Sequence, residues 1–574
     1  MSMIKLNKNF NRKIVAGILG IALLSFAFRD DLFQSSKNLS IFSSLYSELN
    51  LNYVDDVNSS KLIQTGIDAM LQSLDPYTEY VPESEMEDYR MKYVSTQYGG
   101  IGTSIQNRNG KFVIMEVFEG FPAQKTDLRP GDELLEINGI SLKTKSYDVV
   151  SSMLKGPKNT SLKIVVKRPG QDQPLEKSIT REEITQPNVS YAGMINKNIG
   201  YIKLDKFLEN SANEVKDALL SIQKNKPTGV ILDLRSNGGG ILQEAVKIVN
   251  LFVPANITVV TQKGRNREKT FTYKTYNNPI AENLPLVVLI NSRSASASEI
   301  VAGSLQDIDR AVVIGQRSFG KGLVQQTFSL PYNSLVKITV AKYYTPSGRC
   351  IQALDYTHRT NEGSVEKVAD SLITAFRTRA GRTVYDGSGI YPDIYTQPIK
   401  YSPISQTLVS RYLVFDYATQ YRNQKERIIE PKSFRLTESE YNDFVNYLGD
   451  KDYNYDTRTE KLLNDLKTEA EKERKYSEIK SEYELLKNKV YVSKKNDLNL
   501  FKEEIRRLLE NEIVSRYYFQ RGRMEQGFKY DEEIKAATTV FANKSTLAAI
   551  LHGEGAYKSI GKPAGGFSAS TARQ

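Results

Sequence analysis

Hydrophobic side chains change their spacing several times along this chain, and each change indicates a different kind of structure. Residues 38–90 carry apolar positions at helical spacing, as in KLIQTGIDAMLQSL, which predicts an N-terminal helical segment. Residues 91–170 carry short β-branched runs broken by Gly and Pro, as in KFVIMEVF and SLKIVVKR, which predicts a small, mostly β domain with one helix. Residues 186–400 alternate strand patterns such as GVILDL and PLVVLI with helical patterns, which predicts a layered α/β core.

Beyond residue 400 the pattern becomes almost entirely helical. Residues 401–545 are rich in Glu and Lys, with few strand signals, which predicts a C-terminal helical region. Residues 546–574 are expected to form a flexible tail. A short heptad stripe in the helical region indicates a helical appendage or a pair of helices and is too short for a long coiled coil. It consists of Tyr476, Ile479, Tyr483, Leu486 and Val490.

The first 28 residues have the pattern of an export signal. Four basic residues precede an uninterrupted apolar run over residues 14–28. This run is shorter than the roughly 20 residues that a membrane-spanning helix usually needs. We therefore expect export to the periplasm or to the periplasmic face of the inner membrane. Residues 1–28 would act as a cleaved signal peptide or, as the alternative, as a membrane anchor.

Composition narrows the functional classes. A chain of 574 residues with 40% hydrophobic and 25% charged residues is expected to fold into several globular domains. The net charge is +11, but the basic residues are mixed with acidic ones along the chain, so a nucleic-acid partner is not expected. A single cysteine, Cys350, excludes an internal disulfide, and two histidines cannot form a zinc cluster. We expect no metal and no organic cofactor.

Glycines cluster at the start of the β-rich stretch, in YGGIGTSIQ, and LRPGDELLEINGISL follows at residues 128–142. Together these segments resemble a PDZ domain, in which backbone N–H groups of a glycine-containing loop bind the terminal carboxylate of a peptide and a strand pairs with the peptide. Glycine permits the backbone angles that turn several N–H groups toward one anion. The simpler alternative is a tight turn before a strand. The expected peptide-binding residues are Gly99, Gly100, Ile101 and Gly102.

The segment VVIGQRSFGKGLVQQ comes within one residue of the nucleotide-binding pattern G-x-x-x-x-G-K-[ST], through Gly315, Gly320 and Lys321. Gly322 stands where the pattern requires a magnesium-binding hydroxyl. The following LVQQTFSLP predicts a strand, whereas a phosphate loop needs a helix there. We therefore reject a nucleotide-dependent enzyme, and Lys321 needs another role.

A serine cluster lies where a predicted strand ends and a helix begins, in LINSRSASASEIVAG. The N-terminus of a helix offers unpaired N–H groups that can stabilise an oxyanion, so this junction suits a nucleophile. The alternative is structural, because Ser296 and Glu299 also fit a capping box. Neither His358 nor His552 has the local context of a catalytic triad. Lys321 could serve as the base instead, if burial lowered its pKa from about 10.4 toward about 7–8.

The whole stretch LINSRSASASEIVAGSLQDIDRAVVIGQRSFGKGLVQ resembles the active-site region of the carboxyl-terminal processing proteases, also called tail-specific proteases, of peptidase family S41. The resemblance continues in LDPYTEY, DLRSNGGG, YYTPSGRCIQ and GIYPDI, in family order over roughly residues 38–394. It implies that Ser296 is the nucleophile, Lys321 the general base and Gln325 the residue that positions the lysine. In an extended strand Gln325 would share the face of Lys321.

The same resemblance implies an α/β catalytic core of the type shared by ClpP and crotonase, with the PDZ domain inserted after the N-terminal helical segment. It implies a serine endopeptidase that cleaves exported proteins at or near their C-termini. The PDZ domain would bind the free C-terminal tail of the substrate and gate activity. The oxyanion would be held by backbone N–H groups of Ala297 and of a glycine in SNGGG, with Gly238 and Gly239 as the named candidates and Gly240 as a further alternative.

A second hypothesis comes from a different class, a PDZ-based peptide-binding scaffold of the envelope whose protease core is inactive. Intact Ser296, Lys321 and Gln325 argue against it. The resemblance weakens after about residue 401. Homodimer formation, substrate enclosure and adaptor docking therefore all stay open for the C-terminal helical region.

Overall fold

The computed structural model describes residues 33–94, 97–359 and 365–561. The expected signal peptide at residues 1–28 lies outside the described residues, as do residues 562–574 of the expected tail. No described helix combines the length and the apolar composition that crossing a membrane requires. The chain divides into two compact units, one formed by residues up to 83 with residues 326–339 and the other by the rest.

The first unit confirms the predicted N-terminal helices. Residues 33–52 are helical, and a second helix, α2, covers Ser59–Gln72. The turn in LDPYTEY is built on Asp75, whose carboxylate accepts the N–H groups of Tyr77 at 2.8 Å and Thr78 at 2.9 Å. Such a side-chain turn ends the helical segment and leads into strand β1, Glu79–Val81, which pairs with residues 335–337.

The second unit begins with the expected small β domain. Its antiparallel sheet has the order β3-β4-β5-β7-β8, and its main helix, α5 (Tyr147–Leu154), is capped by Ser146. The last strand reaches Thr180, so the domain extends beyond the predicted boundary at residue 170. The strands are β3 Thr103–Arg108, β4 Lys111–Val117, β5 Glu133–Ile137, β7 Ser161–Lys167 and β8 Leu175–Thr180. A two-stranded ribbon, β2 (Gln97–Gly100) with β9 (Glu182–Thr185), flanks this sheet.

The α/β core is confirmed as a six-stranded sheet with the order β10-β11-β12-β15-β16-β23. Only the first pair is antiparallel, and the other neighbours run parallel. Strands β12 and β15 are buried at every position, because helices cover both faces of a parallel sheet and its strands therefore become continuous apolar runs. The bounds are β10 Val189–Met194, β11 Ile199–Leu204, β12 Gly229–Asp233, β15 Leu286–Ile290, β16 Val312–Gly315 and β23 Ile394–Tyr395.

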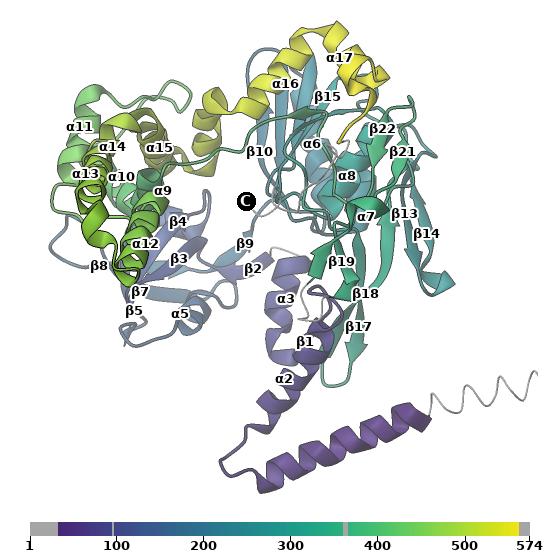
Figure 1. The fold of residues 1–574 in the computed structure, drawn as a ribbon, viewed down its shortest axis with the longest axis horizontal. Helices are drawn as coiled ribbons and strands as arrows, with labels where there is room; N and C mark the ends of the chain where they lie inside the picture. The colour runs from purple at the N-terminus through teal and green to yellow at the C-terminus, as the bar shows by residue number, and fades with distance from the viewer. Residues whose placement is uncertain (1–32, 95–96, 360–364, 562–574) are drawn as a thin grey trace, which may run out of the picture. The chain divides into compact units, whose positions relative to one another are not determined.

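Helices α6 (Ser211–Gln223), α7 (Leu242–Asn250) and α8 (Ala297–Asp307) cover one face of this sheet. Two helices from the end of the chain, α16 (Glu532–Ala542) and α17 (Lys544–His552), cover the other face (Figure 1). Successive residues of one strand point to opposite faces, so Val230 and Leu232 belong to the first cluster and Ile231 to the second.

Residues 546–561, the described part of the expected flexible tail, are folded instead. Helix α17 runs to His552, a 3-10 turn follows at Gly555–Lys558, and the Ile560 N–H donates to the Thr383 carbonyl oxygen at 2.8 Å. The buried Ile550 packs in the core cluster on the second face of the sheet. The apolar surface that Ile550 packs against exists only in the folded sheet, so the Gly-rich sequence around Ile550 does not predict this packing.

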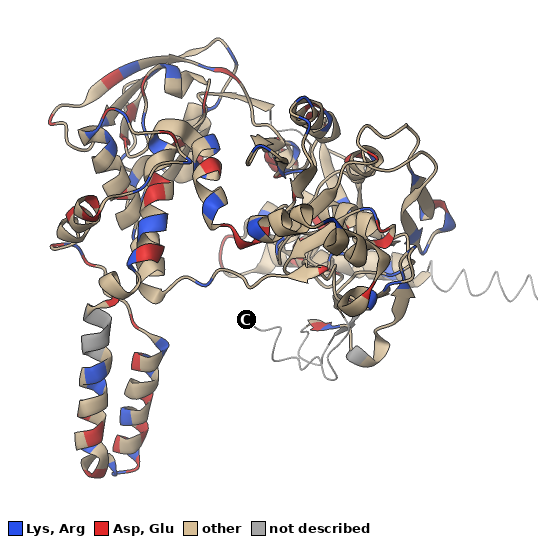
Figure 2. Ribbon diagram, turned by 90° about the horizontal axis from the view of Figure 1, so that it is seen from above, with Lys and Arg blue, Asp and Glu red and all other residues tan. Residues whose placement is uncertain are grey.

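The predicted C-terminal helical region has a hydrophobic core of its own, which includes Leu408, Phe444 and Ile513. Helices α12 (Arg458–Lys472) and α13 (Tyr476–Lys495) pack against each other, which is the second of the two alternatives that the heptad stripe left open. Within α13 the rings of Tyr476 and Tyr483 are in contact. Figure 2 shows Lys and Arg mixed with Asp and Glu along both helices of this pair, at its lower left. The other helices are α9 Pro403–Ser410, α10 Leu413–Gln424, α11 Glu438–Tyr447, α14 Asp497–Leu500 and α15 Lys502–Gly527.

Candidate active site

Ser296 lies at the sharp turn between strand β15 and helix α8. Its backbone has φ 56° and ψ −113°, in a region that non-glycine residues rarely occupy. Strained backbone of this kind persists only where surrounding contacts hold it, and it clusters at functional sites. A strand-to-helix turn of this sharpness presents a serine hydroxyl at the edge of an α/β sheet, as the nucleophile of acyl-transfer enzymes requires.

The neighbouring serines have structural roles, which separates them from Ser296. Ser294 and Ser298 are fully buried, and their hydroxyls donate to the carbonyl oxygens of Leu234 and Asn237, each at 2.8 Å. Ser296 is only half-buried. Of these three serines, Ser296 is thus the one that a substrate could reach.

Glu299 connects the turn of Ser296 to the segment of Lys321. Its carboxylate accepts the main-chain N–H groups of Ser296 at 2.8 Å, Gly320 at 2.7 Å and Lys321 at 2.9 Å. It also accepts the hydroxyl of Ser318 at 2.5 Å. Glu299 is fully buried, and this burial raises its pKa to about 7, against the four hydrogen bonds, which favour the ionised form. The capping-box interpretation is correct for the Ser296 N–H but omits the contacts with the lysine segment.

Tyr343 forms a second connection between the two segments. Its buried hydroxyl donates to the carbonyl oxygen of Lys321 and lies 3.2 Å from the carbonyl oxygen of Ser296. Lys321 itself is half-buried, just before strand β17 (Leu323–Leu330), which carries Gln325. The structure thus brings together the main chains of the predicted nucleophile and the predicted base.

The glycine-rich loop after β12, residues 236–240, packs against the nucleophile. We call it the oxyanion loop. Gly239 has φ 98°, and a Cβ atom there would lie 2.8 Å from both the Ala297 nitrogen and the Ser296 Cβ. The Gly239 N–H already donates to the side-chain oxygen of Asn237 at 2.9 Å. Gly239 is therefore required for close approach, and Ala297 and Gly238 are the better candidates for oxyanion donors.

Two asparagines that sequence reasoning missed hold the oxyanion loop. The Asn237 side chain donates to the Leu204 carbonyl oxygen at 2.8 Å, and the main-chain carbonyl oxygen of Asn237 accepts the Ala295 N–H at 3.0 Å. Asn291, directly after β15, accepts the Ser236 N–H at 2.9 Å. Asn237 stands inside the motif DLRSNGGG, so its presence there was the available signal.

The structure supports the rejection of a phosphate loop. Lys321 leads into strand β17 and not into a helix. Gly315 is needed for another reason, because a Cβ atom at its φ of 130° would lie 2.0 Å from the Ile290 carbonyl oxygen.

The predicted peptide-binding loop is only partly a loop. Gly99 and Gly100 belong to strand β2 and pair with Glu183 and Glu182 of β9. Among the four predicted residues only Gly102 has a left-handed backbone, with φ 79°. Gly99 is instead required for close approach, because a Cβ atom there would lie 2.0 Å from the Gly156 carbonyl oxygen. The buried Ile101 accepts the Ala123 N–H at 2.8 Å through its carbonyl oxygen.

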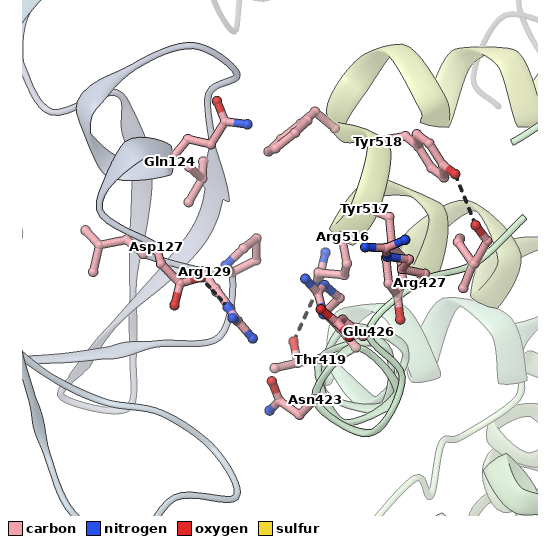
Figure 3. Close-up of a pocket in the computed structure, with 16 residues that line it drawn as sticks. Gln124, Asp127, Arg129, Thr419, Asn423, Glu426, Arg427, Arg516, Tyr517 and Tyr518 are labelled. Carbon is pink, nitrogen blue, oxygen red and sulfur yellow. Dashed lines mark hydrogen bonds and ion pairs between the residues drawn. The ribbon is translucent and has the colours of Figure 1, made fainter. Parts of the chain in front are cut away.

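Two cavities, of about 420 and 900 Å³, lie where the β domain meets the helical region. Figure 3 shows Gln124, Asp127 and Arg129 of the β domain on one side of the smaller cavity and residues of α10 and α15 on the other. Neither cavity is lined by Ser296, Lys321 or Gln325. In the described part of the chain, no group of His, Cys, Asp and Glu side chains is arranged to hold a metal ion.

Comparison with family models gives three matches. Residues 198–360 match peptidase family S41, residues 113–168 match a PDZ domain, and residues 404–541 match the C-terminal helical domain of a probable PDZ-protease. The third match covers the helical region, where the sequence alone had indicated no family.

Two curated relatives and one solved structure are among the similar proteins. A carboxy-terminal-processing protease of Bartonella bacilliformis is 34% identical over 325 residues, which are 56% of this chain and 74% of the relative. A probable CtpA-like serine protease of Staphylococcus aureus is 36% identical over 318 residues, 55% of this chain, so the chain spans only 62% of that relative. The solved structure of the photosystem II D1 C-terminal processing protease is 28% identical, with a TM-score of 0.32, over 54% of this chain and 89% of that protein.

Proposed function

This chain belongs to the carboxy-terminal-processing proteases of peptidase family S41, and we propose that it is a serine endopeptidase with a Ser296–Lys321 catalytic dyad. The observation that carries the proposal is the Glu299 carboxylate, which accepts N–H groups from both Ser296 and Lys321. A serine hydroxyl is a weak nucleophile until an adjacent base takes its proton, so the two residues must be held in one arrangement.

In the proposed reaction the Lys321 amine removes the proton of the Ser296 hydroxyl as the oxygen attacks the carbonyl carbon of the scissile peptide bond. The resulting oxyanion receives hydrogen bonds from the Ala297 N–H, at the start of α8, and from the Gly238 N–H. Lys321 then protonates the leaving amine, and water hydrolyses the acyl-enzyme by the same steps. Gln325 positions the lysine amine.

We assign substrate capture to the PDZ domain. The C-terminal carboxylate of a substrate would bind beside Ile101 and Gly102, and its tail would add to strand β3 in the manner of PDZ ligands. The substrates are exported proteins that are cut at or near their C-termini, and tail binding gates the catalytic core. The site of action is the periplasm or the periplasmic face of the inner membrane.

The test uses full-length protein in mild detergent with a loosely folded substrate that ends in apolar residues. Ser296→Ala and Lys321→Ala are assayed beside it, with and without EDTA, and fragment masses are the readout. Cleavage by the parent alone, unaffected by EDTA and increasing with pH as the lysine deprotonates, is the expected result.

Tail binding without cleavage by the parent would favour the scaffold hypothesis and contradict the proposed activity. Cleavage that survives Lys321→Ala unchanged would contradict the role of the lysine alone.

A further inference from the structure

A buried ionic cluster lies directly before the oxyanion loop, around Arg235. The Arg235 guanidinium, whose side chain is 17% exposed, contacts the Asp233 carboxylate at 2.6 Å. Its other contacts come from the far end of the chain, Asp531 at 2.8 Å and Glu533 at 3.1 Å. Planar, bidentate contacts of this kind fix the orientation of an arginine as well as its position.

The main chain of Arg235 is held as firmly as its side chain. The Lys203 ammonium donates to the Arg235 carbonyl oxygen at 2.5 Å, and the Arg235 N–H donates to the Asp233 carboxylate at 2.8 Å. Asp233 is 1% exposed and also accepts the Tyr201 hydroxyl at 2.5 Å. The peptide unit from which the oxyanion loop departs is thus determined by this cluster.

Asp531 and Glu533, the two distant carboxylates, lie at the N-terminus of helix α16. Asp531 is the N-cap of this helix and accepts the Ile534 N–H at 3.0 Å. Glu533 also accepts the side chains of Gln316 and Thr396, each at 2.7 Å, beside strands β16 and β23. The apolar side of α16 is anchored in the core by Ile534, Ala537 and Val540. The helix is therefore a rigid support for Arg235.

We propose that Arg235 is a positioning residue for the oxyanion loop, and that Asp531 and Glu533 of α16 hold it in the productive orientation. This inference rests on the proposed protease function and gives the C-terminal helices a role in catalysis. Gly238 is three residues beyond Arg235, so a displaced Arg235 moves the proposed oxyanion donor. Displacements of about 1 Å at a catalytic group can lower turnover by about 100-fold.

The charge balance explains why these carboxylates are sensitive positions. Removing one carboxylate leaves part of a buried guanidinium unpaired, which is strongly unfavourable. The arginine then shifts toward water or toward the remaining carboxylate, and the peptide unit attached to it follows. Asp531→Asn and Glu533→Gln preserve size and shape, and each removes the charge and replaces one acceptor oxygen by an NH₂ group.

The experiment compares full-length parent, Asp531→Asn, Glu533→Gln and the double variant. The matched control is Asp309→Asn, which removes a carboxylate from another buried arginine of the core, Arg382, at 2.6 Å. The readouts are kcat and KM for the loosely folded substrate that ends in apolar residues, thermal unfolding, and amide hydrogen exchange of the peptide that covers residues 234–241.

The expected result is a decrease of kcat of about 10-fold in each single variant, below the roughly 100-fold cost of removing a whole oxyanion donor, with KM within about twofold. Hydrogen exchange over residues 234–241 should increase in these variants and stay at the parent level in Asp309→Asn. A purely structural role predicts equal losses of Tm in all variants with kcat unchanged, and this result would overturn the inference.

Failure of the proposed protease function gives a different result. If the parent shows no cleavage that depends on Ser296, the proposed function fails, whereas the exchange measurement still tests whether α16 holds the loop. If the parent cleaves and all variants match it in kcat and in exchange, only the role of Arg235 fails.

Discussion

The carboxylate of Glu299 accepts the main-chain N–H of Lys321 at 2.9 Å, across 22 positions of sequence. The same carboxylate oxygen accepts the Ser296 N–H at 2.8 Å, so one buried acid connects the two segments that carry the proposed dyad. Glu299 and Tyr343 both connect the two segments, so small changes to either group test the arrangement.

Glu299→Gln should make the stability of the protein less dependent on pH. Burial raises the folded-state pKa of Glu299 from 4.5 to about 7. Between these values the folded protein retains a proton that the unfolded chain has lost, so the free energy of unfolding falls as pH rises and is constant above about pH 7. The difference amounts to about 3 kcal/mol between pH 4.5 and 7.

Urea unfolding of parent and Glu299→Gln at pH 5 and pH 8 measures this effect. The parent should lose stability over this range relative to the variant. Parallel behaviour of the two proteins would show that Glu299 does not titrate in this window. The variant should also lose turnover, because glutamine cannot accept all four hydrogen bonds.

Tyr343→Phe should lower kcat by about 10-fold with little effect on KM, because a lost hydrogen bond of about 1 kcal/mol lets the Lys321 segment move relative to Ser296. The ring remains, so packing is preserved and the Tm should change little. Tyr344→Phe, at the adjacent and less buried position, is the control. Unchanged kinetics in Tyr343→Phe would mean that Glu299 alone holds the two segments.

Gly239→Ala should abolish measurable cleavage. A Cβ atom there lies 2.8 Å from the Ala297 nitrogen, and the φ of 98° is unfavourable for alanine. Gly381→Ala separates the two causes, since Gly381 has φ 86° with no atom within 4 Å of its Cβ position. This control should lose about 1–2 kcal/mol of stability, the cost of a left-handed backbone for alanine, and keep its activity. Full activity in Gly239→Ala would contradict the close packing of the oxyanion loop on the nucleophile.

Ala537→Asp should destabilise the catalytic core by more than about 3 kcal/mol, because it places a charge on the covered face of the sheet. Ala537 is fully buried there, whereas Thr539 of the same helix is exposed. Thr539→Asp should therefore leave the Tm nearly unchanged. Thermal unfolding of the two variants compares the buried and the exposed face of α16. Equal Tm values would contradict the packing of α16 on the sheet.

The sequence by itself determined the local and periodic features of this protein. The fully buried strands β12 and β15 are visible in the sequence as continuous apolar runs. The motif around Ser296, Lys321 and Gln325 indicates the family through its resemblance to the active-site region of known members. The predicted β domain, α/β core and helical region follow from the same local patterns, because hydrophobic periodicity is set by the secondary structure of each segment.

Only the tertiary structure decided which distant groups meet. Glu299 looks like a capping residue in sequence, and its contacts with Gly320 and Lys321 exist only because β17 starts beside α8. Arg235 and Asp531 are 296 positions apart, and no local pattern relates them. The last two helices were expected to belong to a helical region and a tail, and they cover the catalytic sheet because its second apolar face has to be buried. Contacts of this kind depend on the folded topology, and the spacing of residues within one segment does not predict them.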